Sequence, residues 1–344
     1  MNIAIIGGGV HGLSTAWRAA SRGHKVTLFE QHPFGHQYGS SKGRSRIVRQ
    51  AYPEPFFTKI LLEGHKLWRE FEAELGEQIY FPVGLLYFGD ADNPDVQSCL
   101  SSLNELDVPH EVLNTDQVKS RWQNPILDPE DAGVFTPDAG WVAADRALIG
   151  LRNLAERQGA VMVQMQVSSL DSLTSFDRII ITAGPWITDF AKVKVEVSVQ
   201  TFAYFEGLYR GPVWIEAGEN GLYGFPTEPG ATSFKAGVHM PGRVIEPENL
   251  DRTPDDWALD ILRDLATRRF GVKNPRIVES GACPYTKTTN DDFQIFWLNK
   301  KTLAASPCSG HGFKFGPWMG DFLTDVLEEK QSLSDFDCFA KRSI

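Results

Sequence analysis

Hydrophobic and polar positions along the chain follow two periodicities, which predict alternating strands and helices. Residues 3–6 form an uninterrupted apolar run, as is typical of a strand buried on both faces of a parallel sheet. Apolar side chains then recur on one helical face, at Val10, Leu13, Trp17 and Ala20. Gly23 is a suitable helix stop, and residues 24–29 are rich in strand-forming side chains. The chain therefore begins with a predicted strand–helix–strand unit.

The same periodicities continue to the C-terminus. They predict helices over residues 56–75, 96–106, 115–122, 144–158, 257–269 and 318–329. They predict strands over residues 81–88, 160–167, 176–183, 196–206, 213–216, 222–226 and 233–238, and further strands between 280 and 315. The consecutive strands between 193 and 238 favour an antiparallel sheet over a ligand cavity.

Glycines between the first strand and the first helix give the spacing G-x-G-x-x-G, at Gly7, Gly9 and Gly12. Such glycines permit a tight turn and let a pyrophosphate approach the helix N-terminus, whose free N–H groups and dipole favour an anion. Glu30 ends the second strand, where a dinucleotide fold needs an acid to accept hydrogen bonds from the ribose hydroxyls. The combination predicts a dinucleotide site, but it does not distinguish FAD from NAD.

The interleaved order predicts a mixed α/β (α+β) fold of two domains. A Rossmann-like nucleotide domain is expected from residues 1–79, 141–191 and 281–344. A largely antiparallel substrate domain, inserted into it, is expected from residues 80–140 and 192–280. The length of 344 residues suits two such domains.

Composition narrows the possible partners. A net charge of −10 argues against nucleic acid or an anionic membrane. No apolar run approaches the roughly eighteen residues of a membrane helix, and the first residues already form a strand, which leaves no room for a signal peptide. The four cysteines lack C-x-x-C spacing, so a reduced, cytoplasmic protein without a metal cluster is expected.

Cys283 is the most distinctive cysteine. It lies in Gly-Ala-Cys-Pro-Tyr-Thr-Lys-Thr, and the segment Ser309-Gly-His-Gly-Phe-Lys-Phe follows twenty-six residues later. A free cysteine is more often a small buried side chain than a reactive group. A thiol close to aromatic and cationic residues, in a chain with a dinucleotide fingerprint, nevertheless suggests a site of cofactor attachment.

Nearly the whole chain resembles the monomeric sarcosine oxidase and N-methyltryptophan oxidase family, within the D-amino-acid-oxidase-like flavoproteins. The resemblance is carried by GGGVHG, GSSKGRSRIVRQAY, TPDAGWV, TAGPW, YGFP, FKAGVH, GACPYTKT and SGHGFKF, all in family order. It implies an FAD-dependent oxidase that converts a small secondary or cyclic amino acid to an imine and reduces O₂ to H₂O₂. It also implies a monomer whose partners are only these small molecules.

The resemblance assigns roles to individual residues. Cys283 matches the family cysteine that forms a thioether with the 8α carbon of FAD. Arg49 and Lys314 match the pair that binds the substrate carboxylate, and a planar guanidinium suits that task. Lys235 matches the lysine that activates oxygen by stabilising developing negative charge. Further matches are Arg46, close to the flavin ring, and the pocket residues Tyr223 and His239.

Further cofactor-binding residues are expected at Ser41, Lys42, Val167, Gly184, Trp186, Gly310, Gly312 and Phe313, together with Arg46 and Lys314. The helix that follows would direct its positive end at the flavin and stabilise the anionic reduced form. His311 is expected to fix the glycine-rich turn in which it lies. Lys42 departs from the family pattern, because it stands where sarcosine oxidase has a histidine. The electronics of the linkage and the substrate range stay open at this point.

Two alternatives remain at the level of sequence. One is a flavoprotein amino-acid dehydrogenase that passes electrons to a protein or quinone instead of oxygen. The other is an assembly subunit that holds flavin without catalytic turnover. The presence of Arg49, Lys314 and Lys235 together argues against this alternative.

Overall fold

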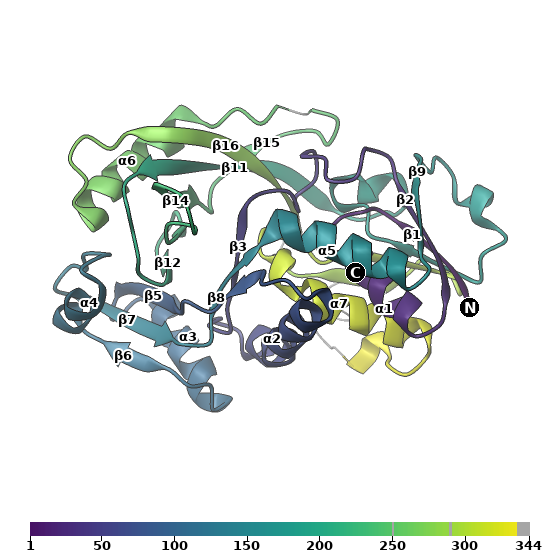
Figure 1. Cartoon of the computed structure of the whole chain (residues 1–344), viewed down its shortest axis with the longest axis horizontal. Helices are drawn as coiled ribbons and strands as arrows, with labels where there is room; N and C mark the ends of the chain where they lie inside the picture. The colour runs from purple at the N-terminus through teal and green to yellow at the C-terminus, as the bar shows by residue number, and fades with distance from the viewer. Residues whose placement is uncertain (250, 289–290, 336–344) are drawn as a thin grey trace.

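The structure is a computed structural model that describes residues 1–249, 251–288 and 291–335. Its strands form a six-stranded sheet, a nine-stranded sheet and a small three-stranded sheet. Figure 1 shows the first sheet with its helices beside the N-terminus, and the large sheet on the other side of the molecule. No helix among these residues is long and apolar enough to cross a membrane.

The six-stranded sheet has the order β17-β18-β10-β1-β2-β9. All its neighbours are parallel except the hairpin of β17 and β18. Its strands come from the beginning, the middle and the end of the chain, namely β1 (Asn2–Ile6), β2 (Lys25–Glu30), β9 (Val161–Gln164), β10 (Arg178–Ile181), β17 (Gln294–Trp297) and β18 (Thr302–Ser306). The N-terminal fingerprint therefore lies at the centre of a parallel sheet.

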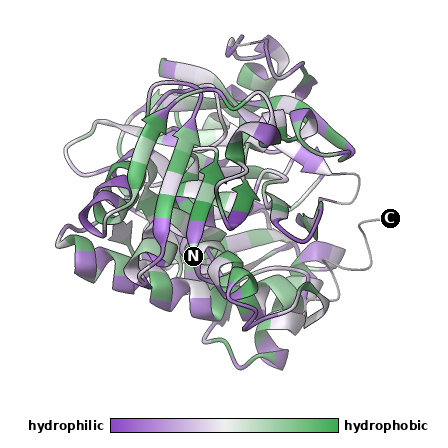
Figure 2. Ribbon diagram, turned by 90° about the vertical axis from the view of Figure 1, so that its right-hand side faces the viewer, coloured by the Kyte–Doolittle hydropathy of each residue, from purple (hydrophilic) through white to green (hydrophobic). Residues whose placement is uncertain are grey.

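Both faces of this sheet are buried, which explains why β1 is apolar from Ile3 to Ile6. Ile3 and Ile5 face a core that they share with the helices, whereas Ala4 and Ile6 face a second core formed by the 3-10 segments and loops after β9 and β10. Figure 2 shows these strands as mostly hydrophobic ribbons framed by helices of mixed polarity. The helices of the first core are α1 (Val10–Ser21), α2 (Pro55–Leu75), α5 (Ala144–Arg157) and α7 (Gly316–Leu327).

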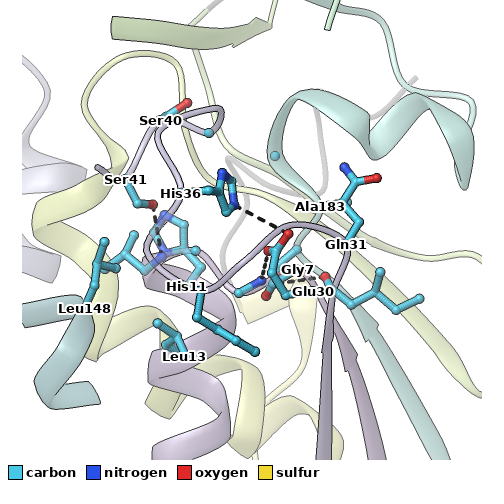
Figure 3. A pocket seen from close by; sticks show the side chains of 18 of the residues that line it. Gly7, His11, Leu13, Glu30, Gln31, His36, Ser40, Ser41, Leu148 and Ala183 are labelled. Carbon is cyan, nitrogen blue, oxygen red and sulfur yellow. Dashed lines mark hydrogen bonds and ion pairs between the residues drawn. The ribbon is translucent and has the colours of Figure 1, made fainter. Parts of the chain in front are cut away.

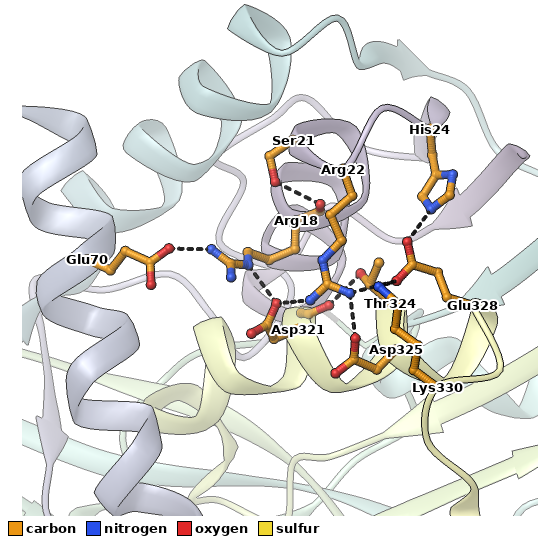
Figure 4. Close-up of polar contacts among 11 residues, drawn as sticks. Arg18, Ser21, Arg22, His24, Glu70, Asp321, Thr324, Asp325, Glu328 and Lys330 are labelled. Atoms are coloured by element: carbon orange, nitrogen blue, oxygen red, sulfur yellow. Dashed lines mark hydrogen bonds and ion pairs between the residues drawn. The ribbon is translucent and has the colours of Figure 1, made fainter.

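Helices α1 and α7 lie in close contact, although they come from opposite ends of the chain. Glycines of α7 allow the approach, because a Cβ on Gly316 would meet Val10 and one on Gly320 would meet the backbone of Ser14. An ionic network closes one end of the interface, where Arg22 contacts Asp321, Asp325 and Glu328 of the C-terminal segment (Figure 4). The start of α7 is thereby fixed beside the start of α1.

The nine-stranded sheet has the order β15-β11-β14-β13-β12-β5-β7-β6, with β16 on the second side of β11. It is antiparallel except for the parallel pair β5–β12. Its strands are β5 (Leu85–Asp90), β6 (Glu111–Leu113), β7 (Asp131–Thr136), β11 (Val195–Glu206), β12 (Val213–Glu216), β13 (Leu222–Phe225), β14 (Ser233–Val238), β15 (Arg243–Val244) and β16 (Ile277–Thr288). Against it pack α3 (Pro94–Glu105), α4 (Thr115–Trp122) and α6 (Asp256–Phe270).

The three-stranded sheet joins the two larger parts. It consists of β3 (Ser45–Val48), β8 (Gly140–Ala143) and β4 (Tyr80–Phe81). Short 3-10 segments occur at η1 (Leu170–Leu173), η2 (Gly184–Asp189), η3 (Gly312–Phe315) and η4 (Leu333–Asp335).

The predicted fold class is confirmed, whereas several predicted elements are corrected. The single strand predicted for residues 81–88 is wrong, because Gly84 takes a positive φ of 80° and separates β4 from β5, which belong to different sheets. The strands predicted for 160–167 and 176–183 are confirmed but shorter. The end of the strand region predicted for 280–315 is instead the 3-10 turn η3. The sequence did not predict strands β3, β6, β7, β8 and β15, of which all but β7 have four residues or fewer, too short for a periodicity to show.

Candidate active site

The carboxyl ends of β1, β2, β9 and β10 surround a cavity of about 420 Å³, and this is the edge at which parallel sheets bind ligands. Figure 3 shows its lining around the glycine turn, with Glu30, His36 and Ser41 directed toward it. Ser41 satisfies a free backbone N–H at the N-terminus of α1, because its Oγ accepts a hydrogen bond of 3.0 Å from Val10. Residues far apart in the sequence thus converge on the turn that follows β1.

Glu30 is fixed at the end of β2 by hydrogen bonds to both carboxylate oxygens. The backbone N–H groups of Gly8 and His32 donate to it at 2.7 and 2.9 Å, and His36 Nε2 lies at 3.4 Å. Burial alone would raise the pKa of Glu30, but these hydrogen bonds outweigh it and lower the pKa. The site therefore holds an oriented carboxylate that can accept hydrogen bonds from ribose hydroxyls.

The fingerprint glycines serve different physical needs. Gly7 has a φ of 106° and lies against the Thr182 carbonyl group, and a Cβ on Gly12 would overlap the Gly7 carbonyl oxygen. Gly7 and Gly9 line the cavity, whereas Gly12 does not. Gly12 therefore permits close packing of α1 on the turn instead of approach of a ligand.

The other residues expected to bind the cofactor lie on the same cavity or on its neighbour. Those lining the first cavity are Ser41, Lys42, Val167, Gly184, Trp186, Gly312 and Phe313. Gly310 lines a second cavity of about 850 Å³. Lys42 forms an ion pair of 3.3 Å with Asp145.

The second cavity lies between β3, the large sheet and η3. It is lined by the residues that the sequence analysis expects to bind the substrate or take part in catalysis. Its lining contains Arg46, Arg49, Tyr223, Lys235, His239, Cys283 and Lys314. The two cavities share wall residues, among them Ser40, Lys42, Cys308 and Phe313. An elongated ligand can therefore reach from the glycine turn to Cys283, as a dinucleotide with a redox-active ring requires.

Cys283 is only partly buried and has a cation at its sulfur. The distance from Arg46 Nη2 to Cys283 Sγ is 3.4 Å. In register, Cys283 of β16 pairs with Gln200 of β11. A fixed positive charge therefore lies beside this sulfur.

Lys235 is a buried cation on β14 with aromatic neighbours. Its side chain is 4% exposed, and its ammonium lies 4.8 Å from the ring centre of Phe202 and 5.0 Å from that of Phe225. Burial, and to a smaller extent Arg46, lower its pKa to about 7. Among the described residues it has no hydrogen-bonded or ion-paired partner, so its charge is directed at the cavity.

Arg49 and Lys314 meet at Tyr52. The Arg49 guanidinium lies over the Tyr52 ring, 4.1 Å from its centre, and Lys314 Nζ donates to the Tyr52 hydroxyl at 2.9 Å. Within the described part of the chain, neither basic side chain forms an ion pair with a carboxylate. The pair can bind an external carboxylate.

Tyr223, His239 and Tyr285 form the opposite wall. His239 Nδ1 lies 3.4 Å from the Tyr285 hydroxyl. Burial lowers the pKa of His239 to about 4 and raises that of Tyr223 to about 12, so both are uncharged at neutral pH. This wall can make polar contacts without adding charge.

Sequence reasoning missed several residues of the site. Tyr52 was quoted only as part of a motif, although its place three residues after Arg49 was a usable signal. His11 lines the first cavity, and its buried Nδ1 has no hydrogen-bond partner in the described structure. No local pattern marks Cys308 or Asp145, which tertiary packing brings to the junction of the cavities.

Comparison with known proteins supports the cofactor expectation. The family model described as FAD dependent oxidoreductase matches residues 2–326. The peroxisomal sarcosine oxidase of Homo sapiens is 27% identical, and the match covers 94% of this chain and 90% of that protein. The monomeric sarcosine oxidase of Bacillus sp. (strain NS-129) is 25% identical, with 98% and 96% covered. The N-methyl-L-tryptophan oxidase of Yersinia pestis (strain Pestoides F) is 25% identical, with 98% of both chains covered.

Solved structures with the same fold include NikD, described as an unusual amino acid oxidase essential for nikkomycin biosynthesis. It superposes with a TM-score of 0.83 at 22% identity, covering 98% of this chain and 96% of NikD. The L-proline dehydrogenase from P. horikoshii gives a TM-score of 0.82 at 20% identity, with 96% and 94% covered. These likenesses establish the fold, and the sequence relatives confirm the resemblance on which the site residues were chosen.

Proposed function

The chain belongs to the family of FAD-dependent oxidoreductases, and from that premise we propose that it oxidises a small secondary or cyclic amino acid to an imine and reduces O₂ to H₂O₂. The observation that carries the proposal is the pair Arg49 and Lys314, two basic side chains without a carboxylate partner among the described residues, held together by Tyr52. They lie in the same cavity as Cys283 and Lys235. Relatives named as oxidases of sarcosine and of N-methyl-L-tryptophan support this substrate class.

The protein residues bind, orient and hold charge. Arg49 and Lys314 bind the carboxylate, and the uncharged wall of Tyr223, His239 and Tyr285 accommodates an uncharged amine. When bound, the flavin ring supplies the redox chemistry, accepting two electrons from the substrate and passing them to oxygen. Lys235 places a cation where negative charge develops on oxygen.

The flavin is proposed to be covalently attached as a thioether between Cys283 Sγ and its 8α carbon. Forming this bond replaces one S–H and one C–H bond, and O₂ takes up the two electrons and two protons as H₂O₂. Arg46, 3.4 Å from the sulfur, supports it by placing a cation at the atom that would bond to the flavin. Acid-stable flavin in the purified protein would support this linkage.

The remaining expectations stay proposals. The FAD-binding domain would comprise residues 1–79, 141–191 and 281–344, and the substrate domain residues 80–140 and 192–280. The proposed boundary at residue 281 falls inside β16, a single strand that pairs with β11 as far as Thr288. The name of the Bacillus relative supports a monomer. Free Cys99, Cys283 and Cys308 suit a reducing cytoplasm, and Cys338 lies outside the described residues.

Anaerobic bleaching of the flavin by a panel of secondary and cyclic amino acids tests the proposal. Bleaching is expected with at least one of them and should need far higher concentrations in Arg49→Ala. Bleaching unaffected by this substitution would overturn the carboxylate assignment. A bleached enzyme that produces no H₂O₂ in air would instead indicate a dehydrogenase, and a flavin that no amine bleaches would indicate a protein without turnover.

A further inference from the structure

A continuous hydrogen-bonded chain leads from the carboxylate-binding end of the cavity toward the surface. Lys314 Nζ contacts the Tyr52 hydroxyl at 2.9 Å, and the same hydroxyl lies 3.1 Å from His311 Nδ1. His311 Nε2 in turn lies 3.2 Å from the backbone carbonyl oxygen of Asp291, an exposed residue. The ammonium also donates to the His311 carbonyl oxygen at 2.6 Å.

The partners fix the direction of the hydrogen bonds. A carbonyl oxygen can only accept, so His311 carries its proton on Nε2 and presents a lone pair at Nδ1. The Tyr52 hydroxyl therefore has two acceptors within reach. It donates to His311 when Lys314 is an ammonium ion, and it can donate to Lys314 when that group is an uncharged amine.

The surroundings of Lys314 disfavour its positive charge. Its side chain is 6% exposed, and burial, followed by Arg49 and Arg46, lowers its pKa well below the usual value. Burial likewise lowers the pKa of His311 and raises that of Tyr52 to about 12, so both are uncharged.

The neighbouring elements do not balance the charge. From the β3 side, Arg46, Arg49 and Tyr52 face Lys314, and helix α2 contributes the Trp68 indole, which donates to the Lys314 carbonyl oxygen. Glu54 and Cys99 contribute to the electrostatic environment of Tyr52, whereas the charged groups that act on Lys314 are Arg49 and Arg46. Among the described residues no carboxylate forms an ion pair with Lys314.

We propose that Lys314 is an uncharged amine in the ligand-free cavity, that it accepts the ammonium proton of the incoming amino acid as the carboxylate binds, and that the Tyr52 hydroxyl then turns its hydrogen bond from Lys314 to His311. The inference rests on the proposed carboxylate clamp. The step is balanced: the zwitterion loses one N–H proton, Lys314 gains it, and no electrons move. One group thus binds the carboxylate and leaves the substrate nitrogen with the free electron pair that its oxidation requires.

The proposal predicts that the number of protons taken up from solvent on binding differs between ligands. A zwitterion brings its own proton and needs none from solvent. A carboxylate without an ionisable nitrogen must be matched by up to one proton taken up from solvent. Arg49 cannot contribute to this count, because a guanidinium stays protonated.

Calorimetric titration of the FAD-loaded enzyme in buffers of different ionisation enthalpy measures this count. The probes are methoxyacetate, in which oxygen replaces the nitrogen, and 2-aminoisobutyrate, a zwitterion without a hydrogen on its α carbon. Binding of methoxyacetate is expected to be accompanied by proton uptake at neutral pH, because burial lowers the pKa of Lys314 well below its usual value, and binding of 2-aminoisobutyrate by markedly less. Binding of methoxyacetate without proton uptake overturns this inference alone, whereas no carboxylate binding overturns the proposed function as well.

Variants identify the groups. Lys314→Arg should bind methoxyacetate without proton uptake, and Lys235→Met, which removes the other buried lysine of the cavity, should retain the uptake; the reverse pattern overturns the assignment.

Discussion

The Arg46 guanidinium lies 3.4 Å from the Cys283 sulfur and is held there by backbone carbonyl groups. Its Nη2 donates to the oxygens of Ser40 and Lys42 at 3.0 and 2.6 Å. The cation is therefore fixed beside the thiol independently of any ligand. The Lys42 side chain, by contrast, pairs with Asp145. The positive charge at the proposed attachment point thus comes from Arg46, although Lys42 replaces the family histidine nearby.

Substituting Cys283 by alanine is expected to leave the fold intact and to make the flavin dissociable. The Cys283 sulfur is the only atom through which we propose the linkage, and the side chain is small and partly exposed. Acid precipitation of the native protein should give a yellow pellet, whereas Cys283→Ala should release all colour into the supernatant.

Cys308→Ala is the matched control, because Cys308 is also a free, partly buried cysteine on the same cavity. Its pellet should stay yellow. Colour loss in this variant, or a yellow pellet from Cys283→Ala, would contradict the assignment.

Replacing Lys235 by methionine is expected to slow reoxidation of the reduced enzyme by oxygen by about 10²–10³-fold, the range seen when one electrostatic donor is removed. Because burial lowers the pKa of Lys235 to about 7, the wild-type rate should fall as the pH rises through that region, since the ammonium is then lost. Lys235→Met should show a flat pH profile over the same range.

The measurement is stopped-flow mixing of photoreduced enzyme with oxygenated buffer. Anaerobic reduction by substrate is the internal control and should change only several-fold. If both half-reactions slowed equally, Lys235 would act on the cavity as a whole and not on oxygen.

The glycine turn and its acid were predictable from the sequence because they are local. Gly7, Gly9 and Glu30 lie within one strand–helix–strand unit, and spacing alone fixes their relation. Gly12 has the same spacing signal, yet it lies against the Gly7 carbonyl oxygen, and spacing cannot distinguish a glycine that contacts a ligand from one that permits helix packing.

The second cavity could not be derived from periodicity. Arg49 and Lys314 are 265 residues apart in the chain, and only the docking of η3 on β3 brings them to Tyr52. The family resemblance supplied these residues, but not the tyrosine between them. Pairwise geometry of this kind depends on tertiary packing, so no motif reveals it.

Gly320→Ala is expected to destabilise the protein by about 1–3 kcal/mol, because an added Cβ would overlap the Ser14 backbone where α7 crosses α1. Gly64→Ala is the matched control within helix α2. Its Cβ would meet only Leu61 at 3.4 Å and Trp318 at 3.8 Å, so stability should be unchanged or higher. Urea unfolding monitored by tryptophan fluorescence compares the two, and equal effects would contradict close packing at the α1–α7 crossing.

Glu328 makes the stability of the same interface depend on pH. Its carboxylate contacts Arg22 at 2.9 Å, His24 at 2.8 Å and Lys330 at 2.6 Å. Burial alone would raise the pKa of Glu328, but hydrogen bonds from Lys330, His24 and Arg22 outweigh it and lower the pKa from 4.5 to about 2. A carboxyl group with a lower pKa in the folded state stabilises the protein above its unfolded pKa, and the stabilisation is lost as the pH falls toward the folded value.

Glu328→Gln should therefore be less stable than wild type by about 1 kcal/mol at neutral pH, a value reduced for the partial solvation of the network. The difference should shrink as the pH falls from about 4.5 toward about 2, because the wild-type carboxylate then becomes protonated. Glu70→Gln is the control, since Glu70 pairs with Arg18 at the exposed rim of the network, where ion pairs contribute little. The measurement is the midpoint of urea unfolding across this pH range. If the difference in stability between Glu328→Gln and wild type persisted unchanged in acid, the charge of the carboxylate would not be the cause of that difference.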